Sequence, residues 1–270
     1  NFVAGDRTLS GREVAVPADA RVWLIRADNP SPMTLSGTNS WVVEVGGAVW
    51  VIDPGPDDVG HIGSLAAKAR ELGTPAGVAL THDHLDHSAG VQQLAKTLGG
   101  VPVLRYGNAV ASPFAVLHTP GHAADHLVFW IGADEQVTLF SGDLVLGQSS
   151  TIVPPGGGTL IAYLESLKQL SAVAPSLILP GHGEPIEDAA AAVVAQREHR
   201  LRREADLREA LAERIYEREE LLDRVWGDVP ESLRIAAHVT MQSHLEKLDL
   251  EDALPQDFEA EGRKTWQHRP

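Results

Sequence analysis

The order of apolar and polar positions predicts alternating short strands and helices over the first 190 residues. Apolar runs bounded by Gly, Pro and Asp are typical of strands, and those at 40–45 and 48–52 flank Gly46-Gly47, a two-residue hairpin signal. Helical spacing is predicted at 65–72, 89–98 and 159–170. The other predicted strands are 21–25, 76–80, 101–104, 115–118, 127–131, 137–141 and 177–179. This alternation indicates a mixed α/β domain.

The pattern changes near residue 190. Between 189 and 225 the strand signals stop, charges of both signs are interleaved, and apolar residues such as Leu211 and Leu222 fall near helical spacing. Pro230 begins a further helical stretch that reaches His244, for which a solvent-facing position is expected. The predicted organisation is an α/β domain at 1–190, a helical domain at 191–255 and a tail at 256–270.

Candidate chemistry begins where the predicted strand 76–80 ends. The seven residues 81–87 contain the pattern His-x-His-x-Asp-His, made of His82, His84, Asp86 and His87. Imidazole and carboxylate groups together suit zinc and similar divalent ions. Three histidines in six residues are more specific than an ordinary turn requires, so this stretch predicts a metal site.

Further metal-competent side chains follow other predicted strands. His122, Asp143 and His182 each come after a strand and a small residue, and Asp53 ends the strand 48–52. A lone Gly-His or Gly-Asp pair is more often an ordinary turn, whereas several such segments in one chain indicate one convergent site. Asp53 apart, these segments and the stretch 81–87 supply five histidines and two aspartates. They are enough for two ions with three ligands each and one shared carboxylate.

Composition narrows the functional classes. Hydrophobic residues make up 43% of the 270, which supports a full core, and no apolar run reaches the ~18 to 20 residues of a membrane span. No charged leader precedes an apolar run. The lack of cysteine excludes disulfides and thiolate ligands and fits a cytoplasmic protein. A formal charge of −15 argues against broad binding to a polyanion, although a local basic groove stays open.

These motifs resemble the metallo-β-lactamase superfamily over residues 29–248. The resemblance implies an αββα sandwich and a dinuclear hydrolase site. It implies that Asp53 supports the metal-binding loop from outside the ligand set. His126 is a candidate for lining the site, with an ordinary core or surface role as the alternative. The implied ligands are His82, His84 and His122 for the first ion, Asp86, His87 and His182 for the second, and Asp143 as the bridge.

Within the superfamily, the sequence is similar to the lactamase-β-like protein two group. The similarity lies in segments such as Gly37-Thr38-Asn39, Thr119-Pro120-Gly121-His122 and Gly142-Asp143, and in a C-terminal stretch ending at 244–248. It implies a C-terminal helical, winged-helix-like appendage. Animal members of that group cleave single-stranded RNA, whereas fungal relatives include thioesterases.

The expected protein is therefore a hydrolase in which two divalent ions, first of all Zn²⁺, share a bridging hydroxide. Asp143 would hold the ions together, and Asp86 would orient the nucleophile. One hypothesis is a phosphodiesterase acting on single-stranded RNA, with a basic stripe of arginines at 197, 200, 202, 203 and 208. The alternative is a thioesterase or lactonase of the glyoxalase II kind, acting on a small acyl substrate. A noncatalytic binding protein on the same fold is the third hypothesis, and the sequence predicts no oligomeric state.

Overall fold

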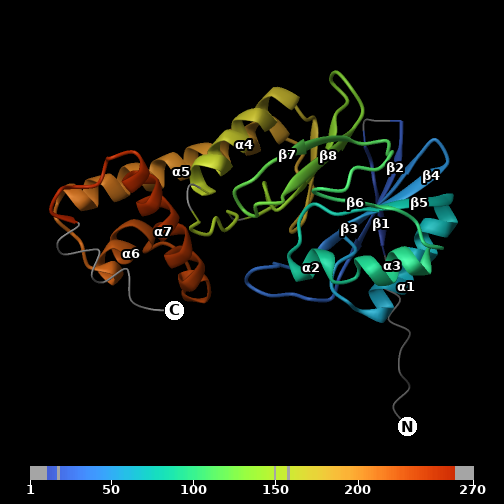
Figure 1. Cartoon of the computed structure of the whole chain (residues 1–270), viewed down its shortest axis with the longest axis horizontal. Helices are drawn as coiled ribbons and strands as arrows, with labels where there is room; N and C mark the ends of the chain where they lie inside the picture. The colour runs from blue at the N-terminus through green and yellow to red at the C-terminus, as the bar shows by residue number, and fades with distance from the viewer. Residues whose placement is uncertain (1–10, 17–18, 149, 157–158, 259–270) are drawn as a thin grey trace, which may run out of the picture.

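Two β-sheets lie face to face, with helices on the outer side of each (Figure 1). The computed structural model describes residues 11–16, 19–148, 150–156 and 159–258. The N-terminal residues, for which the sequence predicts no leader, and most of the predicted tail at 256–270 lie outside these ranges. The described part of the chain has the layer order helix, sheet, sheet, helix, which confirms the predicted αββα architecture.

The first sheet has the strand order β1-β2-β3-β4-β5-β6. Its first four strands are antiparallel neighbours, whereas β5 and β6 are parallel to β4 because helices connect them. The connecting helices α1 (Val59–Leu72) and α3 (Val91–Thr97) cover the outer face. The strands are β1 (Arg12–Val14), β2 (Arg21–Arg26), β3 (Asn39–Val45), β4 (Ala48–Ile52), β5 (Thr74–Ala79) and β6 (Val103–Leu104).

The second sheet has the order β10-β9-β8-β7, with β10 parallel to β9 and the other pairs antiparallel. Helix α4 (Thr159–Val173) precedes β10 and packs on the outer face together with the start of α5 (Ala189–Ala212). The strands are β7 (Ala115–His118), β8 (Leu127–Ile131), β9 (Thr138–Gly142) and β10 (Leu177–Pro180).

Large aromatic side chains fill the space between the sheets. Trp41 and Trp50 point inward from the first sheet, and Phe129 and Phe140 point inward from the second. Val42 and Val51, which alternate with the tryptophans along β3 and β4, face α1 and α3 instead. The period of two in these strands therefore builds the inner and outer cores at once.

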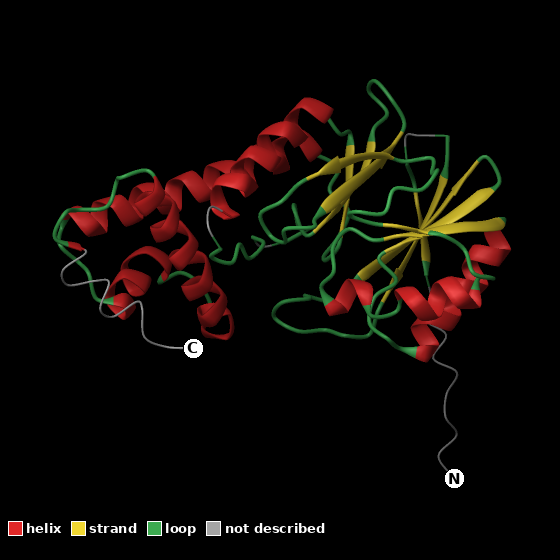
Figure 2. Cartoon of the chain, in the orientation of Figure 1, coloured by secondary structure: helices red, strands yellow, loops and turns green. Residues whose placement is uncertain are grey.

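The C-terminal helices lie beside the second half of α5 (Figure 2) and form a core of their own with it. Ala189 and Val193 of α5 pack on the second sheet, whereas Leu207 and Leu211 pack against the later helices, so this helix crosses the predicted boundary at 190. The later elements are α6 (Arg218–Trp226), the 3₁₀ turn η1 (Glu231–Leu233) and α7 (Arg234–Leu250). Described residues after β10 form helices and no strand, and none of these helices has the length and apolar character needed to cross a membrane.

The structure extends the helical content beyond the sequence prediction. Helix α1 begins at Val59 rather than near residue 65, because the Asp58 side chain caps it by accepting a 2.7 Å hydrogen bond from the backbone N–H of His61. Gly60 and Gly63 hide this start, since glycine has low helix propensity. A short helix α2 (Leu85–Ser88) also lies inside the histidine-rich stretch, outside the helices that the sequence predicts.

His244 is buried, and the expectation of a solvent-facing position is wrong. Its side chain is 0% exposed on α7, its ring centroid lies 5.7 Å from that of Trp226, and neither ring nitrogen has a hydrogen-bond partner among the described residues. Burial, together with the nearby charges of Arg200 and Lys247, lowers the pKa of His244 to about 3. The helical core therefore holds a neutral histidine.

We predict that Gly77→Ala destabilises the protein. A Cβ at Gly77 would fall on the ring of Trp50, which is buried between the sheets. Overpacking of this kind costs about 1–3 kcal/mol, which urea unfolding would measure. The matched control is Gly63→Ala, at an exposed position of α1 with open space around it, where a gain of about 0.5–1 kcal/mol is expected. Equal stability of the two variants would refute the packing assigned to Trp50.

A second prediction concerns acid stability. The unfolded chain binds a proton at His244 near its ordinary pKa of 6.5, whereas the folded chain does so only near about 3. The stability that depends on the neutral ring is therefore present above pH 6.5 and is lost as the pH falls toward 3. Between pH 7 and 5, wild type should lose about 2 kcal/mol more unfolding free energy than His244→Leu. Parallel losses in the two proteins would contradict a neutral buried His244.

Candidate metal centre

The predicted ligands all meet at one edge of the two sheets. The residues 81–87 follow β5 of the first sheet, whereas Asp143 and His182 follow β9 and β10 of the second, and His122 follows β7. Each segment turns sharply after its strand and directs a polar side chain into the space between the sheets. Residues that are up to a hundred positions apart in the chain thereby form one cluster.

His82, His84 and His122 form the first group of candidate ligands. The Nε2 atoms of His82 and His122 each lie 3.0 Å from the Nδ1 atom of His84. A single proton on that Nδ1 could serve only one of them, so the three nitrogens are not mutually satisfied as hydrogen-bond partners. Their ligand atoms lie within 4.8 Å of one another, a spacing suited to one metal ion.

Asp86, His87 and His182 form the second group. The Nε2 atoms of His87 and His182 are 3.2 Å apart, and Asp86 Oδ2 lies 3.4 Å and 3.3 Å from them. The two imidazoles are buried, whereas the Asp86 side chain is 30% exposed. This group could hold a second ion and leaves one side of it open toward solvent.

Asp143 lies between the two groups. Its Oδ2 is 3.6 Å from His122 Nε2 of the first group and 3.4 Å from His182 Nε2 of the second, and its Oδ1 is 3.5 Å from His87 Nε2. Oδ1 is buried and has no hydrogen-bond partner among the described residues. A buried carboxylate oxygen without a donor is costly, and a cation at this point would satisfy it.

Hydrogen bonds behind the rings set where the protons sit. Thr81 Oγ1 donates its only hydrogen to Asp53 Oδ2 at 2.7 Å, so toward His82 Nδ1, 2.9 Å away, it must accept. His122 Nδ1 likewise faces the Ile152 carbonyl at 2.8 Å, which can only accept. Both rings therefore carry their proton on Nδ1 and turn the Nε2 lone pair toward the centre, which is the state a metal ligand needs.

Asp53 organises this arrangement from behind. Its carboxylate accepts the backbone N–H and the hydroxyl of Thr81, at 2.8 Å and 2.7 Å, and Nδ1 of His87 at 2.9 Å. Asp53 adopts a φ of 50°, a left-handed conformation that costs a residue with a Cβ about 1–3 kcal/mol. One buried carboxylate thus positions a member of each candidate ligand group.

His126 acts on Asp143 rather than on the centre. Its Nε2 accepts the backbone N–H of Asp143 at 3.1 Å, and its Nδ1 faces Thr119 Oγ1 at 2.8 Å, so neither nitrogen is free to bind a metal. Gly142 permits this contact, because it has a φ of 48° and a Cβ at this position would clash with the His126 ring and the Thr81 hydroxyl. His126 is therefore placed to hold the Asp143 backbone.

The charges divide the centre into two halves. Burial lowers the pKa of His82 and of His122, so these rings favour the neutral form. Burial also acts on His87 and His182, but the carboxylates beside them outweigh it, and the pKa of His182 rises to about 10. Burial alone would raise the pKa of Asp143, yet His182 and His87 hold it well below its usual range. Positive charge is therefore favoured between Asp143 and the second group.

The donor set fits divalent metal ions. Two groups of three nitrogen or oxygen atoms converge, a carboxylate lies between them, and the rings with defined protons present lone pairs inward. Asp83, in contrast, is exposed and points away, with its backbone N–H bonded to Asp125. The supporting hydroxyls of Thr81 and Thr119 carry no sequence signal as metal-site residues, because threonine is common after strands.

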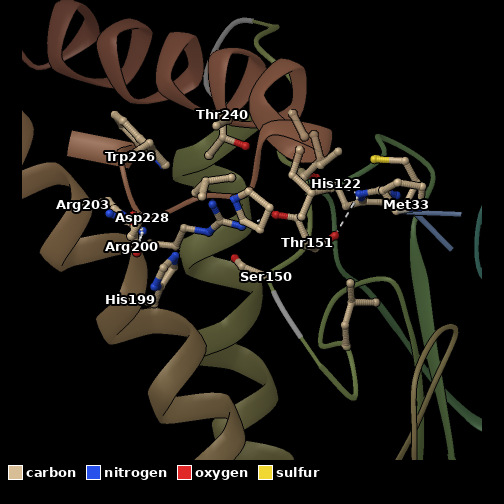
Figure 3. A pocket seen from close by; sticks show the side chains of 18 of the residues that line it. Met33, His122, Ser150, Thr151, His199, Arg200, Arg203, Trp226, Asp228 and Thr240 are labelled. Carbon is tan, nitrogen blue, oxygen red and sulfur yellow. Dashed lines mark hydrogen bonds and ion pairs between the residues drawn. The ribbon is translucent and has the colours of Figure 1, made fainter. Parts of the chain in front are cut away.

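A cavity of about 250 Å³ opens beside the centre (Figure 3). His122 and Asp143 line one end, and residues of α5, α7 and the 226–233 segment line the other, so the C-terminal helices complete its wall. Most of the lining side chains are apolar, among them Leu146, Ile152 and Trp226. The cavity is therefore suited to a small, largely apolar group whose reactive end lies at the metal-binding residues.

Comparisons with known proteins agree with this arrangement. Residues 33–113 and 112–182 match the Metallo-beta-lactamase superfamily. A protein named Beta-lactamase-like protein 2 homolog from Drosophila melanogaster is 31% identical, covering 84% of this chain and 87% of its own. The Atrochrysone carboxyl ACP thioesterase of Aspergillus chevalieri is 32% identical, covering 84% and 80%.

Solved structures share the fold. A Beta-lactamase domain protein from Burkholderia ambifaria has a TM-score of 0.74 at 21% identity, covering 91% of this chain and 90% of its own. A metallo-beta-lactamase family protein from Thermus thermophilus has a TM-score of 0.66 at 23% identity, covering 86% and 94%. The chain therefore belongs to the metallo-β-lactamase superfamily of hydrolytic enzymes, and its relatives there include the β-lactamase-like protein 2 homologues.

Proposed function

We propose that this hydrolase cleaves acyl thioesters at a centre of two divalent ions, for which its nitrogen and oxygen donors favour zinc. The observation that carries the proposal is the mainly apolar cavity whose inner end is formed by His122 and Asp143. An acyl chain in the cavity would place its carbonyl beside the candidate ligands. The thioesterase name of a relative that is similar over 84% of this chain supports the same substrate class.

The geometry is less favourable for single-stranded RNA. Of the arginines in the predicted basic stripe, Arg200 is buried, Arg203 pairs with Asp228 at 2.7 Å, and Arg208 pairs with Glu204 at 3.3 Å. Arg202 also pairs with Glu198 at 3.4 Å. Binding a polynucleotide depends on cations free to contact successive phosphates, and these pairs offset that charge. A noncatalytic role is also disfavoured, since every predicted ligand is present and converges.

In the proposed reaction, water adds to the thioester carbonyl, the carbon–sulfur bond breaks, and an acid and a thiol are released. His82, His84 and His122 would hold one ion and Asp86, His87 and His182 the other, with Asp143 between them. The ions would supply Lewis acidity, which lowers the pKa of water and polarises a carbonyl oxygen. The chain needs no nucleophile of its own in this scheme.

The protein groups would orient the reactants. Asp86 is half-buried at the open side of the second group, where its carboxylate can accept a hydrogen bond from the attacking water. Asp143 is held by two contacts, through its backbone to His126 and through its charge to His182. The proton released from the attacking water would pass to the departing sulfur, because the thiolate is a stronger base than the carboxylate of the acid product.

The hydrogen bonds behind the rings yield a test on metal affinity. Thr81→Val removes the hydroxyl that accepts from His82 and donates to Asp53, and should weaken zinc binding about 10- to 100-fold. Competition with a chromophoric chelator would measure it. Thr97→Val, at an exposed end of α3 where the hydroxyl donates to the Gln93 carbonyl of the same helix, should leave the affinity unchanged. Identical affinities for the two variants would count against the proton positions assigned here.

The activity itself is tested with zinc-loaded protein on a panel of acyl thioesters and on labelled single-stranded RNA. Thioester hydrolysis is expected, and Asp143→Asn should lower kcat/KM at least about 100-fold, because the shared carboxylate loses its charge. Asp134→Asn, an exposed turn residue with a φ of 55°, is the control with the same substitution. RNA cleavage that depends on Asp143, without turnover of any thioester, would refute the proposed substrate class.

A further inference from the structure

Arg200 lines the cavity beside Thr151, whose hydroxyl lies 3.1 Å from Nδ1 of the candidate ligand His122. Its side chain extends from α5 toward the segment around Thr151, which lies next to the predicted ligand His122. There its guanidinium donates to the Thr151 carbonyl (Figure 3). The residue is only 2% exposed, and its guanidinium lies 5.5 Å from the ring centroid of Tyr163. A full positive charge is thus buried in the wall of a mainly apolar cavity.

No carboxylate compensates this charge among the described residues. Arg200 forms no ion pair within 4.0 Å there, and its Nε has no hydrogen-bond partner. Glu204, one turn further along α5, is instead bonded to Lys247 at 2.9 Å and to Arg208 at 3.3 Å. Burial lowers the pKa of Arg200, and the nearby Tyr163 hydroxyl, rather than a carboxylate, acts to raise it. A guanidinium keeps its proton even so, and an unpaired buried charge is costly.

The other polar groups of the cavity do not supply the missing anion. Arg203 is paired with Asp228 through both carboxylate oxygens, at 2.7 Å each, so that pair is neutral as a whole. Burial lowers the pKa of His199 to about 4, which leaves its ring uncharged near neutral pH. Among the described lining residues outside the metal-binding cluster, Arg200 is therefore the cation that no carboxylate compensates.

We propose that Arg200 binds an anionic group of the substrate, namely a carboxylate on the acyl chain, so that the preferred substrates are thioesters of dicarboxylic acids. The inference rests on the proposed thioesterase function. With the thioester carbonyl at the metal-binding residues, the acyl chain would run through the apolar middle of the cavity to the guanidinium. A carboxylate there would form a charge-assisted pair with the guanidinium.

The size of the cavity favours the acyl chain over the carrier as the source of the anion. An engineered cavity of about 150 Å³ holds a benzene molecule, so 250 Å³ has room for about ten heavy atoms. That is close to a six- or seven-carbon acyl chain, whereas a carrier arm with its phosphate is much longer. A phosphate on the carrier would therefore lie outside the cavity, beyond the reach of Arg200.

The test compares thioesters of N-acetylcysteamine, a carrier without phosphate. Adipoyl and pimeloyl thioesters carry the terminal carboxylate, and hexanoyl and heptanoyl thioesters of the same length lack it. Wild type should favour the carboxylate form at least about 10-fold in kcat/KM, and Arg200→Met should reduce this ratio at least about 10-fold. Arg202→Met, on the exposed face of the same helix and bonded among the described residues to Glu198 alone, should keep the wild-type ratio.

Binding provides a readout that is independent of turnover. In calorimetric titration of the zinc-loaded protein, adipate should bind more tightly than hexanoate, and Arg200→Met should abolish that difference. Zinc stoichiometry measured on each variant separates this role from a structural one, because Arg200 also holds the Thr151 carbonyl near His122. Equal losses on both classes of thioester, together with a loss of zinc, would make Arg200 a positioning residue and overturn the proposal.

The remaining outcomes separate this inference from the proposed function. If no thioester is hydrolysed but adipate binding depends on Arg200, the anion site stands and the thioesterase function fails. If thioesters are hydrolysed with no preference for the carboxylate and no effect of Arg200 on the ratio, the anion site is refuted and the thioesterase function stands. A dependence on Arg200 that is seen only with coenzyme A thioesters would assign it to a carrier phosphate and refute the acyl carboxylate.

Discussion

The centre depends on the buried carboxylate of Asp53 at the end of β4. It accepts two hydrogen bonds from Thr81 and one from His87, and through Thr81 it also sets the proton of His82. Because these contacts join the ends of adjacent strands, the register of β4 and β5 fixes the positions of His82 and His87, one member of each candidate ligand group. The strained backbone at Asp53 is consistent with a conformation that the surrounding structure imposes for the sake of the site.

The two sheets contribute unequal parts to the chemistry. The first sheet supplies the dense histidine stretch, in which one short loop and α2 serve both groups. The second supplies His122, Asp143 and His182, whose positions depend on how the sheets pack through the aromatic core between them. Long-range packing and local hydrogen bonds must therefore agree for the ligand atoms to converge. The C-terminal helices then add the wall of the cavity beside that centre.

The convergence of the candidate ligand residues could be predicted from the sequence, because they follow apolar runs and strand ends meet at a sheet edge. The start of α1, the strand β1 and the burial of His244 could not, since they depend on a cap, on one short edge pairing and on tertiary packing. The sequence pattern also does not indicate the roles proposed for Thr81 and Arg200. Thr81 matters through the partner of its single proton, and Arg200 matters because no carboxylate among the described residues faces it.

The central claim is that one site holds two ions with a carboxylate between them. Anomalous diffraction at the zinc edge from crystals of the zinc-loaded protein tests it most directly. Two peaks are expected, one among His82, His84 and His122 and the other among Asp86, His87 and His182, with Asp143 in contact with both. The ions should be about 3.5–4 Å apart. A single peak, or zinc bound elsewhere on the chain, would contradict the account.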